Sequence, residues 1–464
     1  MNGQKDNASR ELLRLREQVD RPKPAMYLLI AMIVLTVIYV VDEITSNINS
    51  AMQPYVLFDL FNITTRDVTS VSFINAINKV APWTVASNLF LIISPFYKSL
   101  SDRFGRRIFL MINTVGMGIG MLIVMTSHSI FQYVLGMLFM MFFTPNDIQV
   151  LYIMETAPKE KRATYSFIAK GIALISVSLI GLMSKAFLRE DSLGSWRLVY
   201  LIPVIAAILL GVAAYFFIRE TPVFLDRRIA YLSMTPEEKS AAAQDAKNKK
   251  QSSEGGVIKA FKFILTNKQL GWIFITGFLF FASTFYTSYY ATVLEGAMAT
   301  SLVSTALIIF PLVNGVVTMA SGWLSDRMGR KKVCVLLGSL TIAALLVFVL
   351  SCRLGWGPIA AGIAYGCSIG GLWSMSDTLI LTMPAESSPS GMRSSVMGTI
   401  SVMIFAGYFV GQVLFIILQN YIAMDWLFLI ISLPFMAASL FFLITKVKET
   451  KDADLENITE DTYE

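Results

Sequence analysis

The chain has 464 residues, of which 55% are hydrophobic and only 15% are charged, and its mean hydropathy is +0.62. A soluble protein carries about 25% charged residues, so the composition excludes an ordinary soluble enzyme. The formal net charge of +6 is not gathered into a basic stripe with interleaved aromatic residues. We therefore expect no nucleic-acid partner.

The apolar residues form twelve runs, each long enough for a helix to span about 30 Å of hydrocarbon. No run shows the alternation of a membrane β-strand, so each is predicted to be a helix. The sequence predicts an all-α integral membrane protein in the bilayer of the cell membrane. The expected spans are 26–50, 72–97, 108–127, 130–154, 163–187, 196–217, 270–294, 301–324, 333–352, 358–383, 395–418 and 426–446.

The distribution of lysine and arginine predicts the orientation. If both termini lie on one side, 31 of the 38 basic residues lie there too, five lie on the other side, and Lys79 and Lys170 lie within spans. By the positive-inside rule, both termini are expected to be cytoplasmic. The first segment, Met1–Lys23, is polar and charged, unlike a cleavable signal peptide.

One long polar stretch, residues 218–269, divides the spans into six plus six. We interpret it as a cytoplasmic linker with a surface helix near 236–250. The predicted organisation is a tail at 1–25, an N-terminal six-helix bundle at 26–217, a C-terminal six-helix bundle at 270–446 and a tail at 447–464. The two bundles are expected to enclose a central cavity.

A charged motif occurs once in each half. Gly322-Trp-Leu-Ser-Asp-Arg-Met-Gly-Arg-Lys-Lys332 follows the eighth span, and Ser101-Asp-Arg-Phe-Gly-Arg-Arg107 follows the second. Their aspartates are 326 − 102 = 224 residues apart, about half of the chain. A charged turn repeated at this spacing between membrane-length segments indicates a duplicated helical bundle.

Other features repeat in the same order. Glu155-Thr-Ala-Pro158 and Glu386-Ser-Ser-Pro389 are offset by 386 − 155 = 231 residues, and each precedes an arginine by four residues. Arg219-Glu-Thr-Pro222 closes the sixth span, and Lys448-Glu-Thr450 closes the twelfth. A nearly constant offset supports the duplication.

These motifs resemble those of the major facilitator superfamily of secondary transporters, over essentially the whole chain. The G-x-L-x-D-R-x-G-R-K signature is complete after the eighth span. The E-x-x-P-x-x-x-R turns and the segment Arg219–Leu225 resemble its sugar and organic-solute symporter branches. Two positions depart from the family pattern: Lys98 replaces the leading glycine of the first signature, and Gln132 replaces an arginine early in the fourth span.

The resemblance implies that the charged turns hold the cytoplasmic side closed when the cavity faces outward. From the residues alone, Gly322 permits close backbone approach, Gly329 allows a tight turn, and Asp326 can meet a helix N-terminus or an arginine. The alternative is a charged loop that only follows the positive-inside rule. The candidate cytoplasmic gate comprises Asp102, Arg103, Arg106, Glu155, Arg162, Gly322, Asp326, Arg327, Gly329, Arg330, Glu386 and Arg393.

Six ionisable residues lie within the apolar spans. A charge facing lipid near a helix centre costs about 2.5–3.5 kcal/mol, so these side chains are expected to face the bundle interior or a wet cavity. The acids are candidates for proton coupling, whereas the lysines either bind substrate or only pair with acids. The acids are Asp42, Glu43, Asp147 and Asp377, and the intramembrane cations are Lys79 and Lys170.

Depth along the helices suggests pairs. Asp42 and Lys79 lie at similar depth outside the midplane, and Asp147 and Lys170 lie at similar depth inside it, so two acid–lysine pairs are predicted in the first half. Asp377 has no lysine or arginine within any span of its own half, and we expect it to lack a counter-charge. For each pair, and for Asp377, the alternative is a purely structural role, in which the partner only offsets the cost of a buried charge.

Polar and aromatic side chains of the spans predict a substrate cavity. Hydroxyl, amide and ring groups together suit a polar solute with an apolar face, such as a sugar or a small aromatic acid. A tyrosine stripe also occurs in simple packing or an interface belt. Phe278–Ser283 lacks the glutamine pair that is usual in sugar porters, which weakens the sugar assignment. The candidates are Asn75, Asn78, Tyr286, Tyr289, Tyr290, Asn314, Trp373, Tyr408 and Gln412.

The leading hypothesis is a monomeric symporter that moves a small polar organic solute, a sugar or an organic or aromatic acid, by alternating access. The coupling ion is expected to be the proton, with sodium as the alternative. An exporter or drug:proton antiporter is the second hypothesis, although Gly171–Gly181 lacks the proline usual in such proteins. A non-transporting solute sensor is the third. No catalytic or metal-spaced motif occurs, so we expect no enzyme activity, metal or cofactor.

Overall fold

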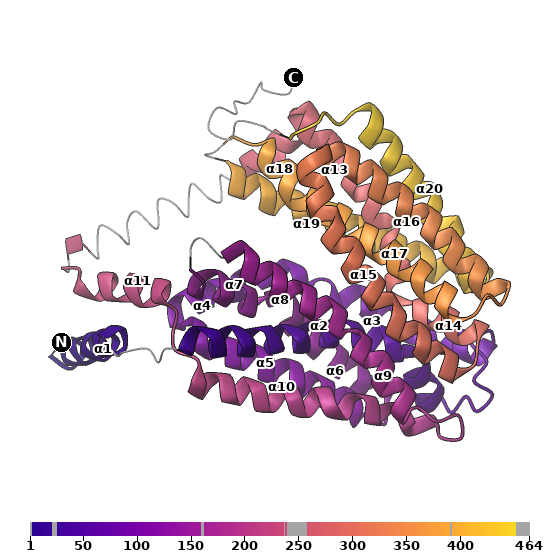
Figure 1. Ribbon diagram of the computed structural model, residues 1–464, viewed down its shortest axis with the longest axis horizontal. Coiled ribbons are helices and arrows are strands. Elements are labelled where there is room, and N and C mark those ends of the chain that lie inside the picture. The colour runs from indigo at the N-terminus through magenta and orange to yellow at the C-terminus, as the bar shows by residue number, and fades with distance from the viewer. Residues whose placement is uncertain are drawn as a thin grey trace.

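The structure is a computed structural model that describes residues 2–20, 26–158, 162–235, 237–238, 258–389 and 392–451. Within these residues all regular elements are helical. The long helices form two bundles (Figure 1), one from each half of the chain. The predicted all-α architecture, with twelve membrane-spanning segments in two six-helix bundles, is confirmed.

The first bundle contains all the long helices before residue 218. Its fourth span includes the short 3-10 helix η1 (Thr144–Asn146), and its sixth is preceded by η3 (Leu193–Trp196). The helices are α2 (Tyr27–Leu60), α3 (Val71–Ser87), α4 (Phe90–Phe104), α5 (Arg106–Met125), α6 (Ile130–Phe143), α7 (Ile148–Thr156), α8 (Arg162–Ser176), α9 (Ser178–Phe187) and α10 (Arg197–Phe217).

The second bundle repeats this order after the linker. It includes the 3-10 helix η4 (Thr284–Ser288) and a π-helical turn, η5 (Thr378–Thr382). The helices are α13 (Lys268–Ala282), α14 (Tyr290–Ala297), α15 (Thr300–Met328), α16 (Arg330–Arg353), α17 (Pro358–Asp377), α18 (Met383–Glu386), α19 (Arg393–Leu418) and α20 (Met424–Thr445).

Five of the twelve expected spans are not single α-helices. In the described ranges, nine helical segments are long and apolar enough to cross a membrane, and they match nine expected spans. The expected span 72–97 is divided at Asn88–Leu89 between α3 and α4, 130–154 is interrupted by η1, 163–187 is divided at Val177 between α8 and α9, 270–294 is divided by η4, and 358–383 is interrupted by the π-helical turn η5. Irregular backbone at membrane depth is tolerated where it is buried in protein or lines a wet cavity.

Shorter helices lie at the end of the molecule that carries the charged turns. Helix α1 (Asn2–Asp20) contacts α11 (Pro222–Ser233), and Glu11 forms a 2.8 Å ion pair with Arg228. A further helix, Ile258–Thr266, meets α13 at an angle of 94°. Apart from residues 237–238, the surface helix predicted near 236–250 lies outside the described residues. The exact boundaries of the tails, bundles and linker stay a prediction.

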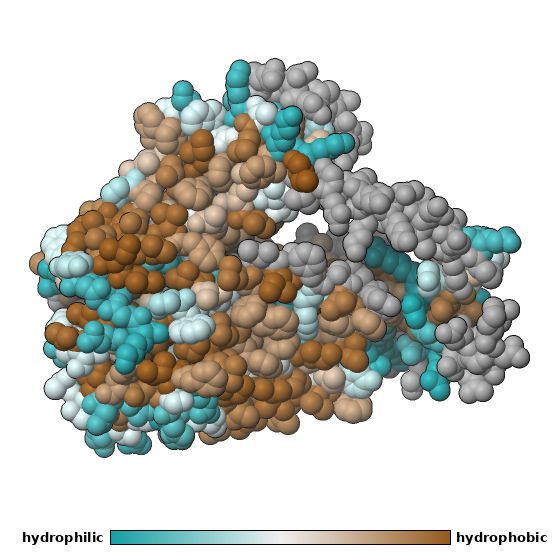
Figure 2. All heavy atoms as spheres, turned by 180° about the vertical axis from the view of Figure 1, so that it is seen from behind, coloured by the Kyte–Doolittle hydropathy of each residue, from teal (hydrophilic) through white to brown (hydrophobic). Residues whose placement is uncertain are grey.

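The faces that meet lipid are apolar. Phe131, Leu209, Phe216 and Phe217 are all strongly exposed, and large brown areas cover both bundles in Figure 2. Such side chains would be unfavourable in water and are favourable in hydrocarbon. Polar groups bond one another within the protein, as for the partly buried Asp59, which accepts from the side chains of Trp196 and Arg197.

The two bundles meet where the fifth span packs against the eighth. Helix α9 packs on α15, and a Cβ added at Gly181 would lie 2.5 Å from the backbone nitrogen of Ile308. Because any larger residue would collide with backbone, only glycine permits this approach. This line of contact between α9 and α15 is called the α9–α15 seam below.

The bundles also touch at the end away from the charged turns. The Tyr55 hydroxyl donates to Glu295 at 2.6 Å, which joins α2 to α14. The Asn78 amide donates to Asn420 at 2.7 Å, and the Gln419 amide donates to Asn78 at 2.6 Å, which joins α3 to the end of α19. We call these two links the outer clasp. Towards the charged turns the bundles diverge (Figure 1), and a hollow opens between them (Figure 2).

Candidate functional site

The first charged turn is built around a helix N-terminus. Gly105 has a φ of +109°, which allows α4 to end and α5 to begin without an intervening loop. A carboxylate from beyond the sixth span caps α5: Glu220 accepts from the backbone nitrogens of Arg106 at 3.0 Å and Arg107 at 3.2 Å. The Arg106 side chain pairs with Glu155 at 3.0 Å. Charge and hydrogen bonding thus tie three separate segments together.

The second charged turn repeats this arrangement 330 − 106 = 224 residues later. Gly329 has a φ of +100°, and Glu449 accepts from the backbone nitrogens of Arg330 at 2.8 Å and Lys331 at 3.2 Å. The Arg330 side chain pairs with Glu386 at 3.2 Å. The two halves therefore share a network, not only a motif.

A threonine completes each network. The Thr221 hydroxyl donates to Glu155 at 2.7 Å, and the Thr450 hydroxyl donates to Glu386 at 2.6 Å. The capping acids and these threonines were absent from the predicted gate. The repeat of Arg219-Glu-Thr-Pro222 in Lys448-Glu-Thr450 was the signal that could have identified them.

Other predicted gate residues play different parts. The expectation that Gly322 permits close approach is wrong in this conformation, because a Cβ added there would meet nothing within 4 Å. Asp326 is largely exposed and pairs with Arg330 at 2.9 Å, and Arg327 lies 4.0 Å above the Trp323 ring. Arg393 donates to the Ser388 carbonyl at 3.4 Å. The side chains of Asp102, Arg103 and Arg162 lie outside the described part of the chain.

The two capping acids differ in their electrostatics. Burial raises the pKa of Glu220 above its usual value, although the backbone N–H groups of Thr221, Arg107 and Arg106 act in the opposite direction. For Glu449 burial also raises the pKa, but hydrogen bonds from four backbone N–H groups outweigh it, so the pKa is lowered. Glu449, the more exposed of the two capping acids, is therefore ionised more readily than Glu220.

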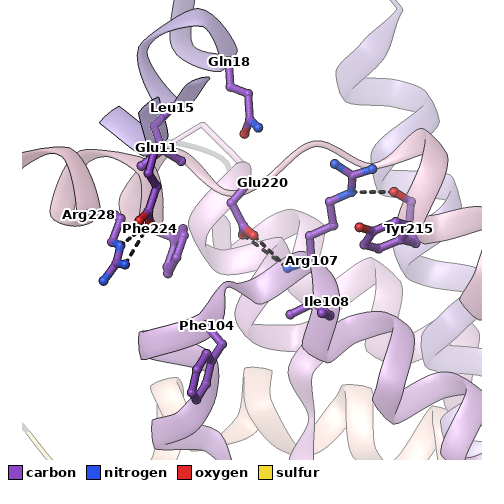
Figure 3. A pocket seen from close by; sticks show the side chains of 10 residues that line it. All are labelled: Glu11, Leu15, Gln18, Phe104, Arg107, Ile108, Tyr215, Glu220, Phe224 and Arg228. Atoms are coloured by element: carbon purple, nitrogen blue, oxygen red, sulfur yellow. Dashed lines mark hydrogen bonds and ion pairs between the residues drawn. The ribbon is translucent and has the colours of Figure 1, made fainter. Parts of the chain in front are cut away.

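A pocket of about 360 Å³ lies beside the first turn, under α1 (Figure 3). Glu220 points from the segment before α11 to the start of α5, and Arg107 turns away to bond the Tyr215 carbonyl. This pocket is at the surface of one bundle and not in the hollow between the two. Its lining comprises Glu11, Leu15, Gln18, Phe104, Arg107, Ile108, Tyr215, Glu220, Phe224 and Arg228.

Asp42 is the most buried acid among the charges predicted within spans. It is only 3% exposed, and its Oδ2 atom accepts from the Gln149 amide at 2.9 Å. Its Oδ1 atom has no hydrogen-bond partner among the described residues. The predicted pairing with Lys79 is wrong: Lys79 lies over the Phe61 ring, 5.3 Å from its centroid.

Asp147 lies where the fourth span breaks. Its φ of 44° and ψ of 36° are left-handed, between η1 and the start of α7. This conformation is uncommon for a residue other than glycine and indicates a local constraint. Asp147 and Glu43 are the charged neighbours of Asp42, and Lys98 also acts on both aspartates. Three acids from two helices therefore share one region of the first bundle.

The remaining predicted pair is corrected by the structure. Lys170 contacts Asp377 at 3.3 Å and not Asp147, so Asp377 does have a counter-charge, supplied by the opposite half. The depth of a residue along its helix does not determine which neighbouring helix its side chain faces. Lys170 still acts electrostatically on Glu43 and Asp147. Lys170 and Asp377 therefore form an accessible ion pair between the bundles, near the buried acids of the first bundle.

The predicted tyrosines of the cavity are fully buried in the second bundle. The Tyr289 ring stacks on Phe415 with centroids 4.0 Å apart, and the Tyr290 ring stacks on Tyr365 at 4.4 Å. The Tyr286 hydroxyl is 2.8 Å from the Ser368 hydroxyl. In this conformation their rings pack against their own half.

Other cavity candidates form a polar network near them. The Gln412 amide donates to the Tyr408 hydroxyl at 2.6 Å, and its oxygen accepts from Tyr289 at 3.3 Å. Ser288, not predicted, is 2.9 Å from the Tyr408 hydroxyl. Trp373 is 45% exposed.

The remaining three candidates are dispersed. Asn75 is exposed on α3, Asn78 belongs to the outer clasp, and Asn314 is buried in α15, where it accepts from Thr318 at 3.2 Å. The structure therefore does not bring all nine candidates into one site.

Two six-helix bundles, a hollow between them and matched charged turns define a multi-pass membrane transporter. The sequence profile of the Major Facilitator Superfamily matches residues 31–412 and 301–460. The chain belongs to this superfamily, and it resides in the cell membrane. By the positive-inside rule we expect both termini and the charged turns to be cytoplasmic and the outer clasp to face the outside.

Known relatives are distant but cover most of the chain. The "Glucose transporter GlcP" of Staphylococcus epidermidis is 23% identical over 382 residues, which is 77% of this chain and 83% of the relative. The solved structure of a D-xylose-proton symporter has a TM-score of 0.68 and 17% identity, with 92% and 99% of the two chains covered. The inward-open xylose transporter XylE from E. coli has a TM-score of 0.66 and 16% identity, with 94% and 100% covered.

Proposed function

We propose that this transporter is a proton-coupled symporter of a small polar organic solute. The observation that carries the proposal is Asp42, a buried carboxylate whose only described partner is the neutral Gln149 amide. An ionised carboxylate without a cationic partner is costly in a low-dielectric interior, and binding a proton removes that cost. Glu43 and Asp147 add like charge beside it and strengthen this preference.

The proton site and the moving parts are connected. Gln149 belongs to α7, directly after the break at Asp147, whereas Asp42 belongs to α2, which also carries the Tyr55 link of the outer clasp. A proton on Asp42 would therefore alter the contact between α2 and α7 and bias the rocking of one bundle against the other. Such rocking around a central site is the general mode of transporters with repeated bundles.

The solute is proposed to be a sugar or an organic or aromatic acid. The hydroxyl and amide groups of Tyr408, Gln412 and Ser288 support a polyhydroxylated or carboxylated solute. The names of the glucose and xylose transporters among the relatives support a sugar. The name of the D-xylose-proton symporter supports coupling of the solute to the proton.

Uptake into proteoliposomes tests the coupling. The wild type is expected to accumulate a radiolabelled sugar or organic acid when the lumen is made alkaline. Asp42→Asn is expected to lose accumulation at least about tenfold and to retain solute exchange, because exchange needs no net proton movement. Asp67→Asn, an acid of an outer loop, is the matched control and should accumulate normally. Full accumulation by Asp42→Asn would refute the proton assignment, and no movement of any solute would favour a sensor.

A further inference from the structure

One ion pair joins the two halves at the hollow. Lys170 on α8 and Asp377 on α17 are 3.3 Å apart, and their side chains are 44% and 53% exposed. The other ion pairs described for this chain each lie within one half, as do Arg106–Glu155 and Arg330–Glu386. A solute that enters the hollow therefore meets one accessible positive group from the first half and one accessible negative group from the second.

An aromatic ring extends this site. Trp373 precedes Asp377 by four residues on α17, so both side chains share a face of that helix, and both are exposed. Because Asp377 reaches Lys170 of the other half, this face is turned towards the hollow. An indole ring beside a carboxylate is a favourable environment for an ammonium or methylated ammonium group.

The two charges of this pair balance each other. Lys170 and Asp377 are both accessible, whereas Asp42 is buried. A simple anion or a simple cation would compensate one member of the pair and leave the other without a partner. A neutral sugar offers hydroxyl groups but no charge to either member. The pair therefore favours a solute that carries a positive group as well as a carboxylate.

We propose that the transported solute is a zwitterion of the amino-acid or betaine type, whose carboxylate binds Lys170 and whose ammonium group binds Asp377 against the Trp373 ring. This inference rests on the proposed transport function; it keeps the broad class of small polar organic solutes and replaces the sugar or simple acid with a zwitterion. When the solute binds, its carboxylate takes the place of Asp377 beside Lys170, and its ammonium group takes the place of Lys170 beside Asp377. Neither residue is then left without an opposite charge. Binding thereby breaks a direct tie between the halves, which would link occupancy of the site to their movement.

Equilibrium binding to the purified full-length protein tests the proposal. The probes are glycine betaine and L-proline as zwitterions, choline as a cation, benzoate as an anion and D-glucose as a neutral sugar. The zwitterions are expected to bind the wild type most tightly. Lys170→Met should weaken them at least about tenfold and leave choline binding unchanged, whereas Asp377→Asn should weaken both the zwitterions and choline. Trp373→Leu should weaken betaine more than proline.

Controls keep the test decisive. Lys170→Arg should retain most zwitterion binding, and Arg228→Gln, which breaks the surface pair between α11 and α1, should change nothing. If Lys170→Met fails to fold, Lys170→Gln and Lys170→Arg provide the comparison. Tight glucose binding that neither variant changes would overturn the zwitterion assignment, and so would equal weakening of all probes by both variants. Gradient-driven glucose accumulation would refute this inference alone, whereas zwitterion exchange without accumulation would refute only proton coupling.

Discussion

The two charged cytoplasmic turns are copies that have diverged in their surroundings. Both have a glycine with positive φ and a glutamate that caps the next helix. In the first turn the Arg106–Glu155 pair is nearly buried, with side chains 6% and 11% exposed. In the second, Arg330 is more accessible and divides its contacts between Glu386 and Asp326.

The difference shows which parts of the duplicated unit are constrained. Backbone capping is kept because the free N–H groups of α5 and α16 need acceptors in either copy. The position that differs in sequence, Lys98 against Gly322, does not require glycine in this conformation, since space around Gly322 is open. The comparison therefore predicts unequal effects for equivalent substitutions.

Removal of the arginines is expected to have the largest effect. Arg106→Ala leaves Glu155 buried without its cation, and the loss of a partner from a buried pair costs about 3–5 kcal/mol. Arg330→Ala should cost less, because Arg330 is more accessible than Arg106 and its second partner, Asp326, is largely exposed. Denaturant unfolding of both variants in detergent measures this difference. Equal losses would show that burial does not distinguish the two turns.

Substitution of the turn glycines is expected to have an intermediate and equal effect. An alanine Cβ would lie 2.7 Å from Glu220 at position 105 and 2.5 Å from Glu449 at position 329, and both backbones have positive φ. A strained backbone of this kind costs about 1–3 kcal/mol. Gly322→Ala is the control and should leave the melting temperature unchanged. A large loss for Gly322→Ala would restore its predicted close approach.

Neutralisation of the capping acids should give the smallest effect, with opposite pH dependence. The lowered pKa of Glu449 contributes stability that is present above its unfolded value of 4.5 and lost as the pH falls through the folded value. The raised pKa of Glu220 contributes stability below 4.5 that is lost as the pH rises through its folded value.

At pH 7, Glu449→Gln should therefore cost about 0.3–1 kcal/mol, as for an acid at an exposed helix N-terminus, and Glu220→Gln should cost less or stabilise. Melting temperatures recorded from pH 4 to pH 7 measure both variants. A larger loss for Glu220→Gln at pH 7 would contradict the difference between the turns.

Much of the fold could be predicted from apolar length and charge, because the bilayer forces each span to be a helix. The breaks at η4 and η5 could not, because Thr284–Ser288 and Thr378–Thr382 read as apolar or neutral segments. The Lys170–Asp377 pair was missed because depth in the membrane does not give the direction of a side chain. Glu220 and Glu449 were visible in the repeat, but their role depends on a distant helix end.

The α9–α15 seam has a consequence for measurement. At Gly181 there is no room for a methyl group, so the contact cannot widen without losing its packing, and we expect it to be the pivot of the rocking motion. Distances across a pivot stay constant, whereas distances away from it change with the angle between the two bundles. Spin labels on the two sides of the seam would then give a constant reference distance. Changes in distance at the outer clasp and at the cytoplasmic turns can be compared with it in the same molecule.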